Sequence, residues 1–129
     1  MDEDIGVRIL RAMIEDVDAA RLGITFVAQP SLESPHRLDV RQPGGCGLVI
    51  DCPPPGSSLF GWIIAVECIQ QEALEVLWGD PWPPCPEHTH PLVPREVEDW
   101  IAWCCPRSGQ PWFRLGTLGS QDAGGRSPR

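Results

Sequence analysis

The central helix of the chain is predicted by residues 57–78, which read SSLFGWIIAVECIQQEALEVLW. Ser57 or Ser58 can cap its first turn, because a serine hydroxyl accepts a hydrogen bond from an otherwise unpaired backbone N–H group. Apolar residues then recur at intervals of three and four, as on one face of a helix; they are Leu59, Trp62, Ile63, Val66, Ile69, Ala73, Val76 and Leu77. Phe60 and Ile64 fall on the back of the first half. We therefore expect that half to be covered on both sides.

The N-terminal part of the chain predicts a second helix and a small sheet. Apolar residues recur at helical spacing from Asp4 to Leu22, and Gly23 follows where a helix commonly ends. Residues 24–28 are short and β-prone, and residues 37–41 and 46–52 flank the turn residues Pro43-Gly44-Gly45. We expect a brief strand followed by a β-hairpin.

The C-terminal part begins with a proline-rich segment. Six prolines between residues 81 and 94 predict irregular backbone until about Arg95. Residues 99–105 and 111–115 predict two strands around a tight turn. The sequence thus predicts an α+β fold with two main helices, a small antiparallel sheet and a C-terminal hairpin. We expect one domain over residues 1–119, a subdomain at 81–116, and a disordered tail at 120–129, which lacks large apolar residues.

The charge and composition exclude some classes of function. The net charge is −8, which disfavours direct nucleic-acid binding. The start Met1-Asp2-Glu3-Asp4 does not resemble a secretory signal, and the most apolar window, Leu59 to Ile69, is too short to cross a membrane. We therefore expect a cytoplasmic protein. Lys, Asn and Tyr are absent, as expected from a GC-rich genome, and we infer a bacterial source.

The cysteines point to metal. The chain has six cysteines, and in a reducing compartment cysteines serve as free thiols or metal ligands. Cys85-Pro86-Glu87-His88 has the spacing of a zinc knuckle, a tight turn whose two ligands point at one metal. Twenty residues later, Cys105-Pro106-Arg107-Ser108-Gly109 repeats the frame between two predicted strands. The two segments form an internal pseudo-repeat.

This pair of segments resembles the knuckle pair of zinc-ribbon and rubredoxin-like proteins, over about a quarter of the chain. The resemblance implies that Cys85, His88 and Cys105 bind one Zn²⁺, whereas Ser108 departs from the pattern because a serine hydroxyl keeps its proton at neutral pH. His90, on the same side of an extended chain as His88, is the better fourth ligand. Cys104 is the substitute, although neighbouring residues of a strand point to opposite faces. The predicted metal ligands are therefore Cys85, His88, His90 and Cys105, a closed set typical of a structural site.

An alternative is that the segment folds without metal, held by the packing of aromatic side chains. Those side chains are Trp82, Trp100, Trp103 and Trp112. Other reactive groups carry weaker signals: Cys46 fits a hairpin, and Glu67, Glu72 and Glu75 fit a solvated helix face.

The leading functional hypothesis is a non-enzymatic interaction protein or accessory subunit with a structural zinc segment. The Trp and Pro residues between Trp78 and Trp112 suggest an exposed recognition surface for a protein partner. The alternative is a small zinc hydrolase in which Cys85, His88 and Cys105 hold the metal, water fills the fourth position, and Glu87 or Asp80 is the base. No residue is assigned a catalytic role, and the sequence predicts neither the enzyme class nor the oligomeric state.

Overall fold

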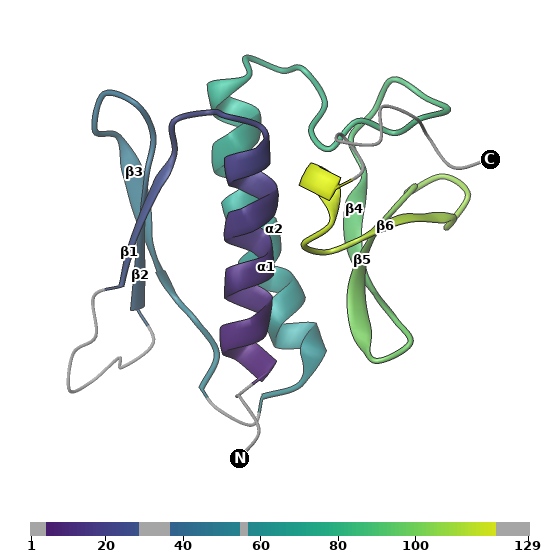
Figure 1. Cartoon of the computed structure of the whole chain (residues 1–129), viewed down its shortest axis with the longest axis horizontal. Coiled ribbons are helices and arrows are strands. Elements are labelled where there is room, and N and C mark those ends of the chain that lie inside the picture. The colour runs from purple at the N-terminus through teal and green to yellow at the C-terminus, as the bar shows by residue number, and fades with distance from the viewer. Residues whose placement is uncertain (1–4, 29–36, 55–56, 121–129) are drawn as a thin grey trace.

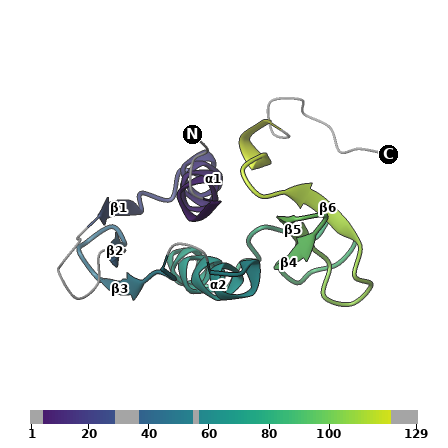
Figure 2. The same ribbon diagram turned by 90° about the horizontal axis from the view of Figure 1, so that it is seen from below.

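The computed structural model describes residues 5–28, 37–54 and 57–120, and within them it places the helices α1 and α2 between two small sheets (Figure 1). Viewed along the helices, α1 lies over α2, with strands β1–β3 on one side and β4–β6 on the other (Figure 2). The combination of helices with two antiparallel three-stranded sheets confirms the α+β class.

The central helix α2 spans Leu59–Val76, close to the prediction. Ser58 is its N-cap in extended conformation but makes no side-chain capping bond. Trp62, Val66 and Ile69 are buried in the core, as the apolar stripe predicts. The expectation of cover on both sides is wrong, because Phe60 is 70% exposed and Ile64 is 49% exposed.

The N-terminal helix α1 spans Ile5–Ala19 and packs against α2. Ile9, Met13 and Val17 are buried at the helical spacing that the sequence displays. The helix ends before the predicted Leu22: Ala20 and Arg21 donate backbone hydrogen bonds to carbonyls three residues back, and Arg21 turns to a positive φ of 57°.

The first sheet contains β1 (Thr25–Ala28), β2 (Arg37–Arg41) and β3 (Gly47–Asp51), all antiparallel, in that order. The predicted hairpin is therefore confirmed, and β1 extends it to three strands. Leu38, Val40 and Ile50 are buried from alternate positions.

The second sheet, which we call the ribbon sheet, contains β4 (Val93–Val97), β5 (Trp100–Cys104) and β6 (Pro111–Arg114) in that order. The strand β4 was not predicted, and it begins before Arg95 with Pro94 inside it. An edge strand tolerates proline because the missing N–H can fall on its unpaired side, and β4 lies at an edge of the sheet. The strands predicted at 99–105 and 111–115 are present with slightly shorter bounds.

The tryptophans are mostly inside, which corrects the expectation of an exposed aromatic surface. Trp82, Trp100 and Trp103 are buried, and the Trp103 side chain is fully enclosed. Trp78 differs from these three and matches the expectation, with 93% of its surface exposed.

No helix in the described part of the chain is long and apolar enough to cross a membrane. The predicted tail lies almost entirely outside the described residues, as does the N-terminal Asp4 of the predicted first helix.

Candidate metal centre

The structure brings the four predicted ligands together at one end of the ribbon sheet. Cys85, His88 and His90 lie on the loop between Pro84 and Pro91, which pair as an isolated antiparallel bridge. Cys105 directly follows β5 and opens the turn that leads to β6. Their ligand atoms all lie within 4.8 Å of one another.

The first of the two loops is closed by backbone hydrogen bonds and held by α2. The Leu92 N–H donates to the Pro83 carbonyl at 2.7 Å, and the Cys85 N–H donates to the His90 carbonyl at 3.2 Å. The buried Gln70 amide of α2 donates to the Trp82 carbonyl at 3.0 Å and the Leu92 carbonyl at 2.7 Å. One side chain of the helix therefore fixes both ends of the loop.

The second loop has the hydrogen bonds of a tight knuckle. Cys105 N–H donates to the Gln110 carbonyl, and the Gly109 N–H donates back to the Cys105 carbonyl, both at 2.8 Å. Gly109 has a φ of 80°, a conformation that glycine adopts without steric cost. The Ser108 N–H points at the Cys105 Sγ at 3.5 Å. Ser108 thus supports the sulfur of Cys105 through its backbone N–H.

The distances from His88 to the two sulfurs match those of a tetrahedral zinc ion, and all four ligand atoms lie within 4.8 Å of one another. Zn–S and Zn–N bonds of the usual length place S and N ligand atoms about 3.5 Å apart in a tetrahedron. His88 Nδ1 lies 3.4 Å from the Cys85 Sγ and 3.5 Å from the Cys105 Sγ. His90 Nε2 lies 3.9 Å from the Cys105 Sγ. The two imidazole rings stack with centroids 4.8 Å apart. The donor set and its spacing therefore fit one small divalent cation.

The two sulfurs are withdrawn from solvent, whereas the imidazoles are half-buried. Cys85 is 5% exposed and Cys105 is fully buried. Desolvation raises the pKa of the Cys105 thiol, but hydrogen bonds from the Ser108 hydroxyl and from the backbone N–H groups of Ser108 and Arg107 outweigh it and lower the pKa to about 6. A thiolate is the form that binds metal. The environment of Cys105 therefore favours the ligand state at neutral pH.

Cys104, the substitute ligand, lies outside the group. It is buried, and its Sγ–H points to the Ala102 carbonyl at 3.6 Å. Burial raises the pKa of its thiol, which favours the neutral form. The alternation of side chains at the end of β5 thus separates Cys104 from Cys105, whereas His90 joins the group from the other loop.

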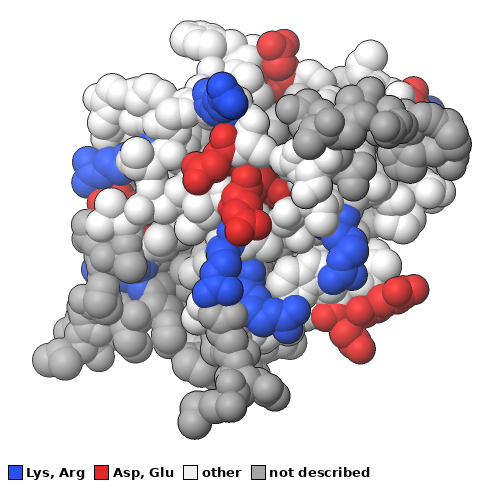
Figure 3. Space-filling view, viewed as in Figure 1, with Lys and Arg blue, Asp and Glu red and all other residues white. Residues whose placement is uncertain are grey.

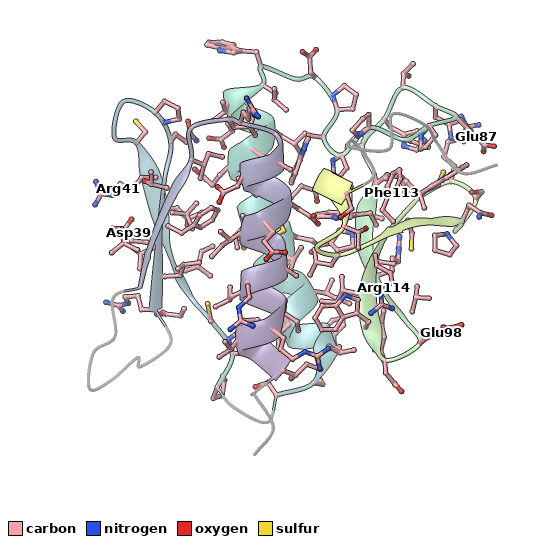
Figure 4. The ribbon with its side chains drawn as sticks, viewed as in Figure 1. Asp39, Arg41, Glu87, Glu98, Phe113 and Arg114 are labelled. Carbon is pink, nitrogen blue, oxygen red and sulfur yellow. The ribbon has the colours of Figure 1, made fainter. Side chains whose placement is uncertain are left out.

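Aromatic packing accompanies the cluster and does not replace it. The rings of Trp82 and Trp103 meet edge to face with centroids 5.7 Å apart. The indole N–H of Trp103 donates to a carboxylate oxygen of Asp16 in α1 at 2.9 Å. Trp100 packs against the guanidinium groups of Arg8 and Arg114, the latter labelled in Figure 4. The features of the metal-free alternative and of the metal site therefore coexist.

The other candidate groups are dispersed. Cys46 is exposed beside the β2–β3 turn, and Cys52 is buried at the end of β3. Desolvation, followed by the charge of Asp51, raises the pKa of Cys52 to about 11. The predicted solvated face of α2 needs one correction, since Glu72 is buried and accepts a hydrogen bond from the Gln42 amide at 2.8 Å.

Two positioning residues were missed from the sequence. Asp16 and Gln70 are both buried and both connect a helix to the ribbon sheet or its loop. Asp16 follows Ile9 and Met13 at helical spacing, and Gln70 follows Val66, so each falls on the apolar face of its helix. A polar residue at such a position is the signal that could have found them.

Comparisons with protein-family models, with curated proteins and with solved structures find no match for the chain.

Proposed function

We propose that the protein is a non-enzymatic interaction protein or accessory subunit, in which one structural Zn²⁺ is held by Cys85, His88, His90 and Cys105. The observation that carries this proposal is the convergence of four ligand atoms within 4.8 Å from two separate loops. A metal at this position joins the segment before β4 to the turn after β5.

The donor chemistry supports zinc among the biological metals. Two thiolates and two imidazoles in a tetrahedron suit Zn²⁺, whereas Mg²⁺ and Ca²⁺ require oxygen ligands. The arrangement of one ligand loop ahead of the ribbon sheet and one inside it also supports a zinc-ribbon-like segment. The six cysteines, all in the described part of the chain, are free thiols, which is compatible with the cytoplasmic location that we propose.

A structural role fits the site better than the hydrolase alternative. A catalytic zinc keeps one position for water, and here His90 stands in reach of that position. The two candidate bases, Glu87 and Asp80, are both exposed. Glu87 projects from the outer edge of the molecule (Figure 4). Neither carboxylate belongs to the ligand group.

Metal analysis and X-ray absorption spectroscopy on the purified full chain test the proposal. We expect about one zinc per chain, with two sulfur and two nitrogen neighbours. Cys85→Ser should abolish stoichiometric zinc, and Cys104→Ser is the matched control that should retain it. A zinc site with an oxygen neighbour in place of one nitrogen would support the hydrolase, and a folded, metal-free protein from zinc-supplemented cells would overturn both.

A further inference from the structure

The outer face of α2 forms a single exposed line of residues, which we call the α2 ridge. In Figure 2 this helix has α1 on one side and a sheet on each flank, which leaves its remaining side open. The exposed residues of the helix fall at intervals of three and four, and the exposed Trp78 follows three positions after the last of them; the ridge residues are Phe60, Ile64, Glu67, Gln71, Glu75 and Trp78. Such spacing places the residues from Phe60 to Glu75 on one helical face, and Trp78 follows in the turn after the helix.

The two ends of the α2 ridge are apolar and strongly exposed. Phe60 is 70% exposed, Ile64 is 49% exposed and Trp78 is 93% exposed. An aromatic side chain buries about 150–250 Å² when it is enclosed, so Phe60 and Trp78 offer on the order of 300 Å² to a partner. Solvent-exposed aromatic anchors are typical of protein recognition sites.

The backbone conformation at Trp78 indicates that this side chain serves binding and not the stability of the fold. Trp78 has a φ of 56°, in the left-handed region, where it ends α2 together with Gly79. Glycine or asparagine adopts this conformation at lower cost than a bulky residue. Since nearly all of the indole faces solvent, the core gains little from tryptophan at this position.

The centre of the α2 ridge is acidic. Glu67, Gln71 and Glu75 stand between the apolar ends, and no member of the ridge is basic. The exposed face of α1 differs, because basic and acidic side chains are interspersed there (Figure 3). Together with the net charge of −8, this pattern favours a cationic partner.

A second copy of the chain is a poor occupant of this face. Two α2 ridges packed about a two-fold axis would enclose four carboxylates, from Glu67 and Glu75 of each copy, with no cation from either ridge. Burial of unpaired like charges opposes association. Phosphate-bearing partners are disfavoured for the same reason.

We propose that the α2 ridge binds a positively charged amphipathic segment of a partner protein. Its apolar side chains contact Phe60 and Ile64, and its Arg or Lys residues pair with Glu67 and Glu75 and lie over the Trp78 ring. Trp78 follows Phe60 by 18 residues, which at the helical rise per residue corresponds to about 27 Å, so the segment is at least that long. This inference names the partner of the proposed interaction protein and therefore rests on that function.

Site-specific photo-crosslinking in the native host tests the inference. The photoreactive residue p-benzoylphenylalanine replaces Gln71 at the ridge centre, Val49 on the first sheet or Glu87 on the metal loop, each in the otherwise intact chain. We expect a partner crosslink from position 71, and mass spectrometry should map it to a segment of net positive charge. Glu67→Lys with Glu75→Lys should lower its yield at least tenfold, and Trp78→Ala several-fold. The charge control Glu96→Lys with Glu98→Lys should leave the yield unchanged.

A charge exchange then tests the pairing directly. A synthetic peptide of the crosslinked segment should bind the wild-type chain, lose at least tenfold affinity for the doubly reversed ridge, and recover when its own basic residues are changed to glutamate. A crosslink from position 71 to another copy of this chain or to an acidic segment, or no excess over position 49, overturns the inference. Crosslinks confined to positions 49 or 87 would leave the interaction role standing without the ridge. An absence of crosslinks from all three positions in zinc-loaded protein would remove both.

Discussion

Replacement of Asp16 by alanine should release the ribbon sheet from α1. The Asp16 side chain is fully buried, and its carboxylate accepts three hydrogen bonds from the C-terminal part of the chain. The indole N–H of Trp103 donates at 2.9 Å, the Gly116 N–H at 2.8 Å and the Leu118 N–H at 3.0 Å. One carboxylate therefore connects residues about 90 to 100 positions apart in sequence.

The expected loss can be estimated from the donors left without a partner. A buried donor without an acceptor costs about 1–3 kcal/mol, with the larger values for the most enclosed groups. Trp103 is fully buried, whereas the bonds to Gly116 and Leu118 are partly buried and water can replace them. Removal of a buried charge offsets part of the loss. We expect Asp16→Ala to lower the free energy of unfolding by about 3–5 kcal/mol, a large share of the roughly 5–15 kcal/mol that holds a typical domain.

Urea denaturation monitored by circular dichroism measures the loss. Asp18→Ala is the matched control, because Asp18 is exposed on the same helix and its replacement should change the free energy by less than about 0.5 kcal/mol. A loss below about 1 kcal/mol for Asp16→Ala would refute the view that this carboxylate ties the ribbon sheet to α1.

The pH dependence of the same site has a defined sign. Desolvation raises the pKa of Asp16 above its ordinary value of 3.8, and the hydrogen bonds from Trp103, Gly116 and Leu118 only partly oppose the shift. The folded state then binds more protons than the unfolded state between 3.8 and the raised pKa, so stability falls as pH rises across that window. Asp16→Asn lacks this dependence. The stability advantage of the wild type over Asp16→Asn should therefore be greater at about pH 4 than at about pH 7, and parallel curves would contradict the shift.

The remaining predictions concern the metal loops. His90→Ala should weaken zinc binding at least tenfold, and Ser108→Cys should restore it in that background by supplying a thiolate at the knuckle position; titration against a chromogenic chelator measures both. Gln70→Leu should leave two buried carbonyls without a donor and lower the free energy of unfolding by about 1–3 kcal/mol, whereas Gln71→Leu, at an exposed position, should not. Chelation of zinc should lower the melting temperature of the wild type and shift its tryptophan emission. In Cys85→Ser, the chelator should change neither the melting temperature nor the emission.

The sequence was most informative where one physical rule acts alone. The helical spacing of apolar residues located α1 and α2 within a few positions, since burial of one face is the main determinant of such helices. The knuckle spacing likewise selected Cys85, His88 and Cys105, which the structure brings together with His90. Selection of His90 over Cys104 needed only the alternation of side chains along an extended chain.

Features that depend on neighbouring elements could not be predicted in the same way. Proline at position 94 argues against a strand, but the rule depends on whether the strand is central or at an edge, which sequence spacing does not reveal. The exposure of Phe60 and Ile64 depends on how many elements pack around α2, and that number follows from the tertiary arrangement. Trp100 and Trp103 were assigned to a surface because of their residue type, whereas their strand lies against the helices.

The two alternatives posed by the sequence, metal or aromatic packing, apply to different parts of the same segment. On the side toward the helices, Trp103 meets Trp82 and donates to Asp16, so packing and hydrogen bonds fix the ribbon sheet to α1. At the loops, the backbone between Pro84 and Pro91 has one bridge and the Gln70 amide at its base, and the ligand atoms themselves fill its interior. A zinc ion bound as proposed would therefore act on the two loops, whereas the ribbon sheet is fixed to the helices by its own contacts. His90 would then supply, from the opposite loop, the ligand that the serine at position 108 does not.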